Sequence, residues 1–193
     1  MPALSPLSAL IMAAYLAAFL VLTAQSARAA SRPVWLFDRG DGQRLPALLF
    51  RLAFAGGLLY PLLLTAGIEP VREFSAPPAA LRVAGLVFAG LGALFAAYAQ
   101  HYMGASWRIG SAEGQSGAIV DTGPFGLSRN PVFVGQVALF SGFVVARPDI
   151  VQLALAAAVV LAVWLQVRVE EKVLERDLGK PYAAYRERVR RWL

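Results

Sequence analysis

The chain has 193 residues, of which 58% are hydrophobic and only 16% are charged, and its mean hydropathy is +0.58. A soluble domain of this length would carry about 25% charged residues, so the composition excludes a soluble globular enzyme, a disordered protein and a water-soluble nucleic-acid binder. The sequence has no cysteine, which excludes disulfides, thiolate metal sites and a cysteine nucleophile. We expect no metal site.

Five apolar stretches account for the excess of hydrophobic residues. Each is about as long as the 17–25 residues that a helix needs to cross a bilayer. They predict membrane helices over residues 5–27, 47–68, 80–100, 131–146 and 150–168. The fold class expected is an all-α integral membrane protein with five transmembrane helices and a C-terminal amphipathic cytoplasmic segment. The length allows one membrane domain, residues 1–193, and no second domain of ordinary size.

The segment Ala27-Arg28-Ala29 is similar to a signal-peptidase site at the end of the first apolar stretch. A secretory signal has a positive region before a short apolar core. Here no lysine or arginine precedes the stretch, and the stretch is longer than such a core. We therefore expect a retained membrane helix.

The basic residues are distributed unevenly along the chain. Most of the 18 lie in residues 28–44, 108–129 and 168–191, which are separated by stretches with few positive charges. Positive charge accumulates on the cytoplasmic side of membrane proteins, so the N-terminus is expected outside and these three segments inside. The net charge of +6 then reflects topology and contact with anionic membrane lipids rather than nucleic acid.

Patterns within the apolar stretches predict local packing. Gly56-Gly57 and Pro61 are expected to interrupt the second helix. Small residues four apart in the third helix predict close approach of another helix: Gly85, Ala89, Ala93 and Ala97. The tight turn at residues 147–149 predicts an antiparallel hairpin of the last two membrane helices.

The C-terminal segment, residues 169–193, is charged but keeps apolar residues three or four apart, which predicts helix. Gly179 and Pro181 are expected to divide it into two helices, with Pro181 in the first turn of the second. A basic amphipathic segment of this kind is expected to lie along the inner membrane face. Its break also predicts a lid that closes over the central loop.

The central loop, residues 101–130, is too long for a passive connection between membrane helices. Asn130 and Pro131 are the residue types preferred at a helix N-cap and first turn. Arg129 is unusual just before a helix, because basic side chains favour helix C-termini. It therefore indicates a local partner or a ligand. For Glu170 and Glu171, two alternatives remain open: ordinary salt bridges, or a polar ligand held between the tail and the loop.

The order of these segments carries a resemblance. Three segments follow one another: TGPFGLSRNPVFVG, a helical hairpin and VEEKVLERDLGKPYAAYRERVRRWL. This order resembles the isoprenylcysteine carboxyl methyltransferase family, whose plan the phosphatidylethanolamine N-methyltransferases share. The resemblance covers about residues 104–192. The matching positions are Gly123, Pro124, Phe125, Arg129, Pro131, Gly135, Glu170, Glu171, Leu174, Gly179, Tyr182 and Tyr185. Two positions depart: Asn130 replaces a histidine and Leu178 a phenylalanine. The Ser106-Trp107-Arg108 stretch is similar to the bacterial branch, which implies a bacterial inner (cell) membrane.

The resemblance implies methyl transfer from S-adenosyl-L-methionine, on the cytoplasmic side, to a lipophilic or membrane-delivered small acceptor carrying a carboxyl, thiol or amine. The catalytic residues implied are Arg129, Asn130 and Glu171. The residues implied in cofactor binding are Trp107, Arg108, Gly123, Pro124, Phe125, Arg129, Asn130, Pro131, Gly135, Glu170, Glu171 and Tyr185.

Asn130 can hydrogen-bond but cannot titrate near neutral pH as a histidine does. This departure is the best support for an alternative from another class: a non-catalytic membrane scaffold or a small transporter-like protein that retains the fold. The partners expected are a lipid or lipophilic acceptor and membrane lipids. The sequence selects neither one acceptor nor an oligomeric state.

Overall fold

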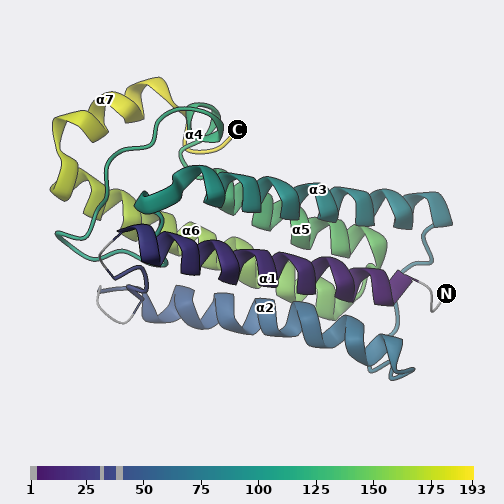
Figure 1. Cartoon of the computed structure of the whole chain (residues 1–193). Coiled ribbons are helices and arrows are strands. Elements are labelled where there is room, and N and C mark those ends of the chain that lie inside the picture. The colour runs from purple at the N-terminus through teal and green to yellow at the C-terminus, as the bar shows by residue number, and fades with distance from the viewer. Residues whose placement is uncertain (1–3, 31–32, 38–40) are drawn as a thin grey trace.

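The computed structural model describes residues 4–30, 33–37 and 41–193, and over these ranges it is built from helices (Figure 1). The helices are α1 Ser5–Ala30, α2 Arg44–Thr65, α3 Ala79–Met103, η2 Gly104–Ser106, α4 Pro124–Leu127, α5 Pro131–Ala146, α6 Ile150–Leu178 and α7 Lys180–Arg188. In the described ranges the sole β pairing is an isolated bridge between Trp35 and Ile109. The all-helical class expected from the sequence is confirmed.

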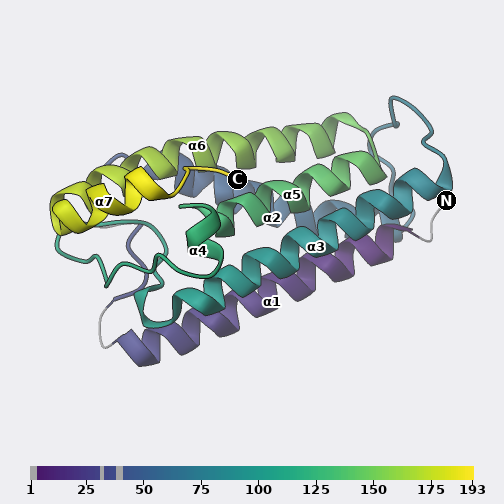
Figure 2. The same cartoon turned by 90° about the horizontal axis from the view of Figure 1, so that it is seen from above.

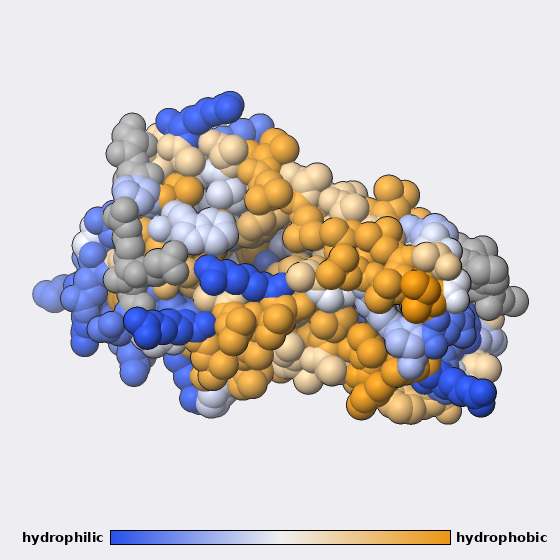
Figure 3. Space-filling model, turned by 90° about the horizontal axis from the view of Figure 1, so that it is seen from below, coloured by the Kyte–Doolittle hydropathy of each residue, from blue (hydrophilic) through white to orange (hydrophobic). Residues whose placement is uncertain are grey.

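The bundle has the dimensions of a membrane domain. The helices α1, α2, α3 and α6 are each long and apolar enough to cross a bilayer. The fifth apolar helix, α5, has 16 residues and so extends about 24 Å at 1.5 Å per residue. Figure 3 shows hydrophobic surface over the middle of the molecule and hydrophilic atoms gathered toward its two ends. Such a surface fits a bilayer that surrounds the bundle.

One of the predicted helix features is wrong. The second helix is not interrupted, because α2 runs through Gly56, Gly57 and Pro61 to Thr65. Neighbouring helices fill the space beside the glycines: a Cβ added at Gly57 would lie 2.7 Å from Met12 Cε, and one at Gly56 would lie 2.6 Å from Leu155 Cδ2. The predicted span over residues 150–168 and the first predicted helix of the tail form one continuous helix, α6, which ends at Leu178.

The closest helix contact joins α3 to α5. A Cβ added at Gly92 would lie 2.6 Å from the backbone nitrogen of Leu139, and one added at Gly142 would lie 2.5 Å from that of Ala89. The predicted stripe is correct at Gly85 and Ala89. Beyond them the contact continues through Gly92 and Ala96 rather than Ala93 and Ala97, because 3.6 residues per turn require spacings that alternate between four and three.

Buried charges hold together one end of the bundle, at the α5–α6 turn. The Tyr60 hydroxyl donates to Asp149 Oδ2 at 2.5 Å, and Arg147 Nε donates to the same oxygen at 2.8 Å. Glu73 accepts from Arg82 at 2.6 Å and from Arg147 at 3.2 Å. We call these five residues the hairpin clamp. The hairpin expected from the turn is confirmed, since α5 and α6 flank it and pack together.

At the opposite end, two loops brace each other. The N–H of Leu36 donates to the carbonyl of Ile109 at 2.8 Å, and the side-chain amide of Gln43 exchanges two hydrogen bonds with the Ser111 backbone, both of 2.6 Å. The first loop is therefore ordered where it meets the central loop. Residues 31–32 and 38–40 of this first loop lie outside the described residues.

Candidate functional site

A cavity of about 370 Å³ lies at the braced end of the bundle. Its walls come from α1, α2, the central loop, the start of α5, the end of α6, and α7. Aromatic rings such as Phe19, Phe50 and Phe54 line the inner part, and Arg129 and Glu170 are among its few charged lining residues. The site therefore combines a mainly apolar interior with a small charged region.

The structure brings most of the sequence-predicted site residues together on this cavity. Those that line it are Trp107, Arg108, Phe125, Arg129, Asn130, Pro131, Glu170, Glu171 and Tyr185. Gly123, Pro124 and Gly135 lie outside its lining. Gly135 contacts the backbone of α3 instead. Gly123, at φ +56°, lets the chain turn tightly beside Tyr102. The helix α4 follows this turn and presents Phe125 to the cavity.

Glu171 binds two arginines from different segments. Its Oε1 lies 3.0 Å from Arg129 Nη1, and both of its oxygens accept from Arg191, at 2.6 and 3.0 Å. Hydrogen bonds to this carboxylate raise the pKa of Arg191. Both side chains of the Arg129–Glu171 pair are largely buried. The buried Arg129 Nε has no hydrogen-bond partner within the described residues, so this cation is positioned but keeps an unmet donor.

The last residues of the chain are fastened to the start of α5. We call residues 189–193 the C-terminal strap. The carbonyl of Arg190 accepts from the Arg129 N–H at 2.9 Å, and that of Arg191 accepts from Asn130 Nδ2 at 3.0 Å. Asn130 holds the N-cap position of α5, but its side chain makes no capping hydrogen bond. The capping role expected for that side chain is therefore wrong, whereas Pro131 does begin the helix.

The short helix α7 folds back beside the end of α6 and over the central loop (Figure 2). Tyr182, Tyr185 and Val189 form an apolar cluster with residues that include Ile119 and Leu178. The Tyr185 hydroxyl donates to the carbonyl of Phe125 at 2.8 Å. Burial raises the pKa of Tyr185 far above its ordinary value, and burial beside Glu171 also raises that of Tyr182. Both phenols are therefore neutral at physiological pH.

The predicted break of the tail is confirmed. The helix α6 ends at Leu178, Gly179 has φ +54°, and Pro181 lies in the first turn of α7. The apolar face of α7 is buried against the protein itself, and the position of the tail along the inner membrane face stays a prediction.

The other carboxylate of the pair, Glu170, faces a different partner. Its Oε1 accepts from Gln166 Nε2 at 3.1 Å, and the same amide nitrogen lies 3.0 Å from Gln43 Oε1. Because adjacent residues project about 100° apart around a helix, Glu171 turns to the strap while Glu170 turns to the cavity wall near Gln166. Sequence reasoning missed Gln166, whose signal was an uncharged polar residue near the end of an apolar stretch.

A second carboxylate on α6 fixes the central loop. Asp177 accepts from the backbone N–H groups of Gly114 and Ser116 at 3.0 and 3.1 Å. The segment that follows, residues 117–120, lines the cavity. The loop, although long, is therefore positioned by specific hydrogen bonds.

These features define an integral membrane protein with a ligand-sized cavity enclosed by loop and tail. Comparison with family models gives a match to the family described as phospholipid methyltransferase over residues 81–181, more than half of the chain. The chain belongs to this family, and the resemblance stated from its motifs is confirmed. Comparisons with curated proteins and with solved structures give no match.

Membership indicates a membrane methyltransferase. The matched range begins in α3 and ends at the start of α7. It includes Arg129, Asn130 and both glutamates of α6, and it excludes the C-terminal strap.

Proposed function

We propose that this protein transfers a methyl group from S-adenosyl-L-methionine to a lipophilic acceptor carrying an amine, thiol or carboxyl group. The observation that supports it best is Arg129, whose buried Nε lacks a partner within the described residues at the charged region of a mainly apolar cavity. Buried donors are nearly always satisfied in native proteins, so this one suits an anionic ligand group.

The residues present fit the donor molecule, which carries a carboxylate, an ammonium, ribose hydroxyls and an adenine ring. Arg129 would bind the carboxylate through a charge-assisted hydrogen bond. Glu171 is already bound to Arg129 and Arg191, so Glu170 is the better partner for the ammonium or ribose. Phe125 and Trp107, both buried and lining the cavity, offer apolar surfaces for adenine.

When bound, S-adenosyl-L-methionine supplies an electrophilic methyl: a lone pair of the acceptor forms the new bond as the carbon–sulfur bond breaks, and sulfur keeps that electron pair as a neutral thioether. The chain supplies alignment and exclusion of water, which are worth several kcal/mol when the geometry is right. The Asn130 amide cannot serve as a base, and the phenols of Tyr182 and Tyr185 remain protonated. An acceptor that arrives as a carboxylate, thiolate or neutral amine needs no such base.

The inner cavity suits a lipophilic acceptor. Leu16 and Phe19 of α1 and Phe50 and Phe54 of α2 line it, and burying an alkyl chain there is favourable by about 0.8 kcal/mol per methylene. The charge asymmetry of the sequence supports a cytoplasmic position for this end of the bundle, and the resemblance of residues 106–108 to the bacterial branch supports a bacterial inner membrane. There the site would receive the donor from water and the acceptor from lipid.

The test is calorimetric binding of S-adenosylhomocysteine to the detergent-solubilised protein. Arg129→Ala should weaken binding about ten- to a hundredfold, the expected loss for a charge-assisted hydrogen bond to the ligand. Glu171→Gln should weaken it as well, because it removes the ion pair that positions Arg129. Lys172→Ala is the matched control, because Lys172 is exposed next to Glu171 on α6 and should bind as the unaltered chain does.

A methylation assay with labelled donor and a lipid extract then identifies the acceptor class. If the unaltered chain binds neither S-adenosylhomocysteine nor the methyl donor, the proposal is wrong and a non-catalytic role of the fold is favoured.

A further inference from the structure

The inner wall of the cavity carries one polar pair among its aromatic rings. Tyr15 on α1 and Gln136 on α5 both line the cavity, and Gln136 Nε2 donates to the Tyr15 hydroxyl at 2.8 Å. Only 3% of Tyr15 and 4% of Gln136 is exposed. The ring of Tyr15 stacks on Phe54, with ring centroids 5.7 Å apart. The pair is thus fixed inside an apolar region.

This pair has hydrogen-bonding capacity left over. A phenol can donate once and accept, and an amide can both donate and accept. The single hydrogen bond between them leaves Gln136 Oε1 without a partner in the described part of the chain, and the O–H of Tyr15 is donated to no described residue. If the oxygen and nitrogen of the Gln136 amide were exchanged, Tyr15 would donate to the amide oxygen. The amide nitrogen would then lack an acceptor and the phenol oxygen would lack a donor, so one donor and one acceptor would still remain.

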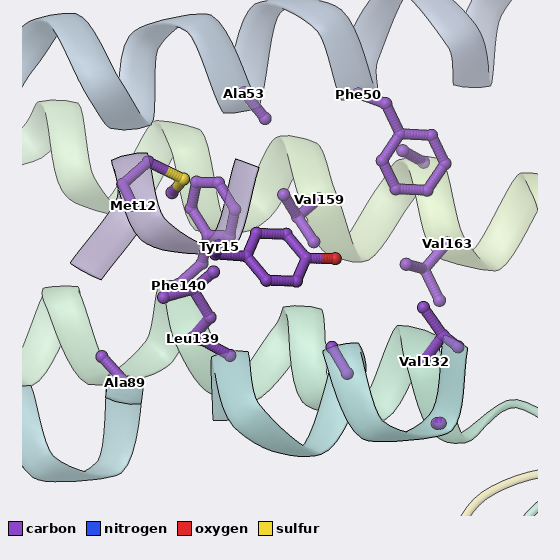
Figure 4. Packing of buried hydrophobic residues seen from close by; sticks show 14 of the residues in the cluster. Met12, Tyr15, Phe50, Ala53, Ala89, Val132, Leu139, Phe140, Val159 and Val163 are labelled. Atoms are coloured by element: carbon purple, nitrogen blue, oxygen red, sulfur yellow. The ribbon is translucent and has the colours of Figure 1, made fainter. Parts of the chain in front are cut away.

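The direction of the Tyr15 hydroxyl indicates the side from which a hydrogen-bond partner would approach. Figure 4 shows the hydroxyl of Tyr15 turned toward the side where Phe50, Val132 and Val163 lie. Phe50 and Val132 also line the cavity. The terminal torsion of a glutamine side chain is broad, so a small rotation of the Gln136 amide would present its oxygen to the same space.

An unmet acceptor inside a membrane bundle is costly, because no bulk water reaches it. A ligand hydroxyl removes this cost, since it accepts from Tyr15 and donates to Gln136. A ligand carbonyl would satisfy only the phenol, and an alkyl chain would satisfy neither. The leftover capacity therefore matches a hydroxyl best.

The depth of the pair fixes where that hydroxyl lies on the ligand. Gln136 is five residues beyond Pro131 on α5, which corresponds to about 7.5 Å along the helix axis. Arg129 and Asn130 lie just before Pro131, at the charged region of the cavity. A ligand whose reacting atom lies near this region would carry its hydroxyl several bonds away, on its lipophilic part.

We propose that Tyr15 and Gln136 form a subsite that binds a hydroxyl on the lipophilic part of the methyl acceptor. The acceptor is then a hydroxyl-bearing amphiphile, not a plain alkyl compound. This inference rests on the proposed function for the identity of the ligand as methyl acceptor, but the subsite itself is a statement about binding.

The experiment compares two probes, hexadecylamine and its analogue with a hydroxyl on the sixth carbon, by thermal-shift titration of the full chain in detergent without donor. The unaltered chain should bind the hydroxylated amine about tenfold more tightly. Tyr15→Phe keeps the ring on Phe54 but should reduce this ratio to about one, and so should Gln136→Leu. The measured quantity is the ratio of the affinities of one variant for the two probes, so a general loss of stability affects both affinities and leaves the ratio unchanged.

Two control variants should keep the tenfold ratio. Tyr98→Phe changes an exposed tyrosine of α3, and Gln100→Leu changes a buried glutamine outside the cavity lining. Equal binding of both probes to the unaltered chain, or an undiminished preference in Tyr15→Phe, would overturn the subsite.

A second arm adds labelled S-adenosyl-L-methionine and measures methylation of the hydroxylated amine. Methylated product supports both proposals. A hydroxyl preference without any methylation supports the subsite and contradicts methyl transfer to an amine. Failure of the subsite and failure of the proposed methyl transfer therefore give different results.

Discussion

Arg191 donates to both oxygens of Glu171 across twenty residues of sequence, and in doing so it joins the last residues of the chain to the end of α6. The same carboxylate lies 3.0 Å from Arg129. One side chain of α6 therefore connects the C-terminal strap with the cation expected to bind the methyl donor.

Replacing Arg191 by alanine should weaken binding of S-adenosylhomocysteine about fivefold. Without Arg191, Glu171 is held by Arg129 alone and positions that cation less firmly for the donor carboxylate. The Arg191 side chain is half-exposed, so the interaction is worth about 1 kcal/mol at most. Calorimetry measures the change. Arg190→Ala, which removes an exposed side chain, is the control, and equal affinities of the two variants would contradict the coupling.

Truncation after Leu178 should abolish donor binding while the bundle remains folded in the membrane. The truncated chain lacks Tyr182 and Tyr185, which line the cavity, and the strap, which binds Asn130 and Glu171. A milder change, Tyr185→Phe, removes only the hydrogen bond to the Phe125 carbonyl and should cost about 1 kcal/mol. Donor titrations on both variants test the lid. A truncated protein with full affinity would show that the tail is only an anchor.

Alkaline pH should release α7. Burial raises the pKa of Tyr185 in the closed tail, so the folded tail favours the neutral phenol. Below the ordinary tyrosine pKa of about 10 the phenol is neutral in both the closed and the released tail, so pH does not change the free energy of closure. Above it the phenol ionises in the released tail but stays neutral in the closed one, so closure weakens as pH rises through 10. Proteolysis of the tail should therefore accelerate from pH 8 to pH 10.5, and less so in a Tyr182→Phe/Tyr185→Phe variant.

Two glycines of α3 should respond oppositely to alanine. Gly92→Ala places a methyl 2.6 Å from the Leu139 backbone nitrogen and should destabilise the bundle by about 1–3 kcal/mol. Gly90 has no atom within 4 Å of such a methyl, so Gly90→Ala should be neutral or stabilise by up to about 1 kcal/mol. Thermal unfolding in detergent compares them, and similar melting temperatures would exclude close packing of α3 on α5.

The membrane orientation can be tested with reporter fusions. Fusions at Gln115 and Leu193 should report a cytoplasmic position, and one at Pro77 an external position, because positive charge is concentrated in the central loop and tail. A cytoplasmic signal at Pro77 would reverse the orientation and move the site to the outer face.

The sequence was most informative where composition decides the structure. Apolar length alone predicted α1, α3 and α5 to within a few residues of their observed bounds. It was wrong at Pro61, because neighbouring helices in a bundle support a helix that a proline would break in isolation. It also misplaced the small-residue stripe, since a spacing of four drifts around a helix whose period is 3.6.

For the site, the motifs predicted which residues converge on the cavity but not how they pair. Arg129 and Glu171 are 42 positions apart, and only the packing of α6 against α5 brings them together. Asn130 was expected to cap its own helix, yet its amide binds the strap. Gln136 went unnoticed because a single glutamine barely alters the hydropathy of an apolar stretch, although an isolated polar residue there is a functional signal.

The hairpin clamp has a consequence for movement. Its Asp149 is fully buried and its Arg147 mostly so, and separating such a pair would leave uncompensated charge, at about 3–5 kcal/mol. The ion pairs that hold the tail at the far end, Arg191 to Glu171 and Arg188 to Asp121, are partly exposed and individually weak. Thermal fluctuations that part the helices should therefore pivot at the clamp and be widest beside the cavity. Spin labels at the two ends of α1 and α6 should show a broad distance distribution near the cavity and a narrow one near the clamp.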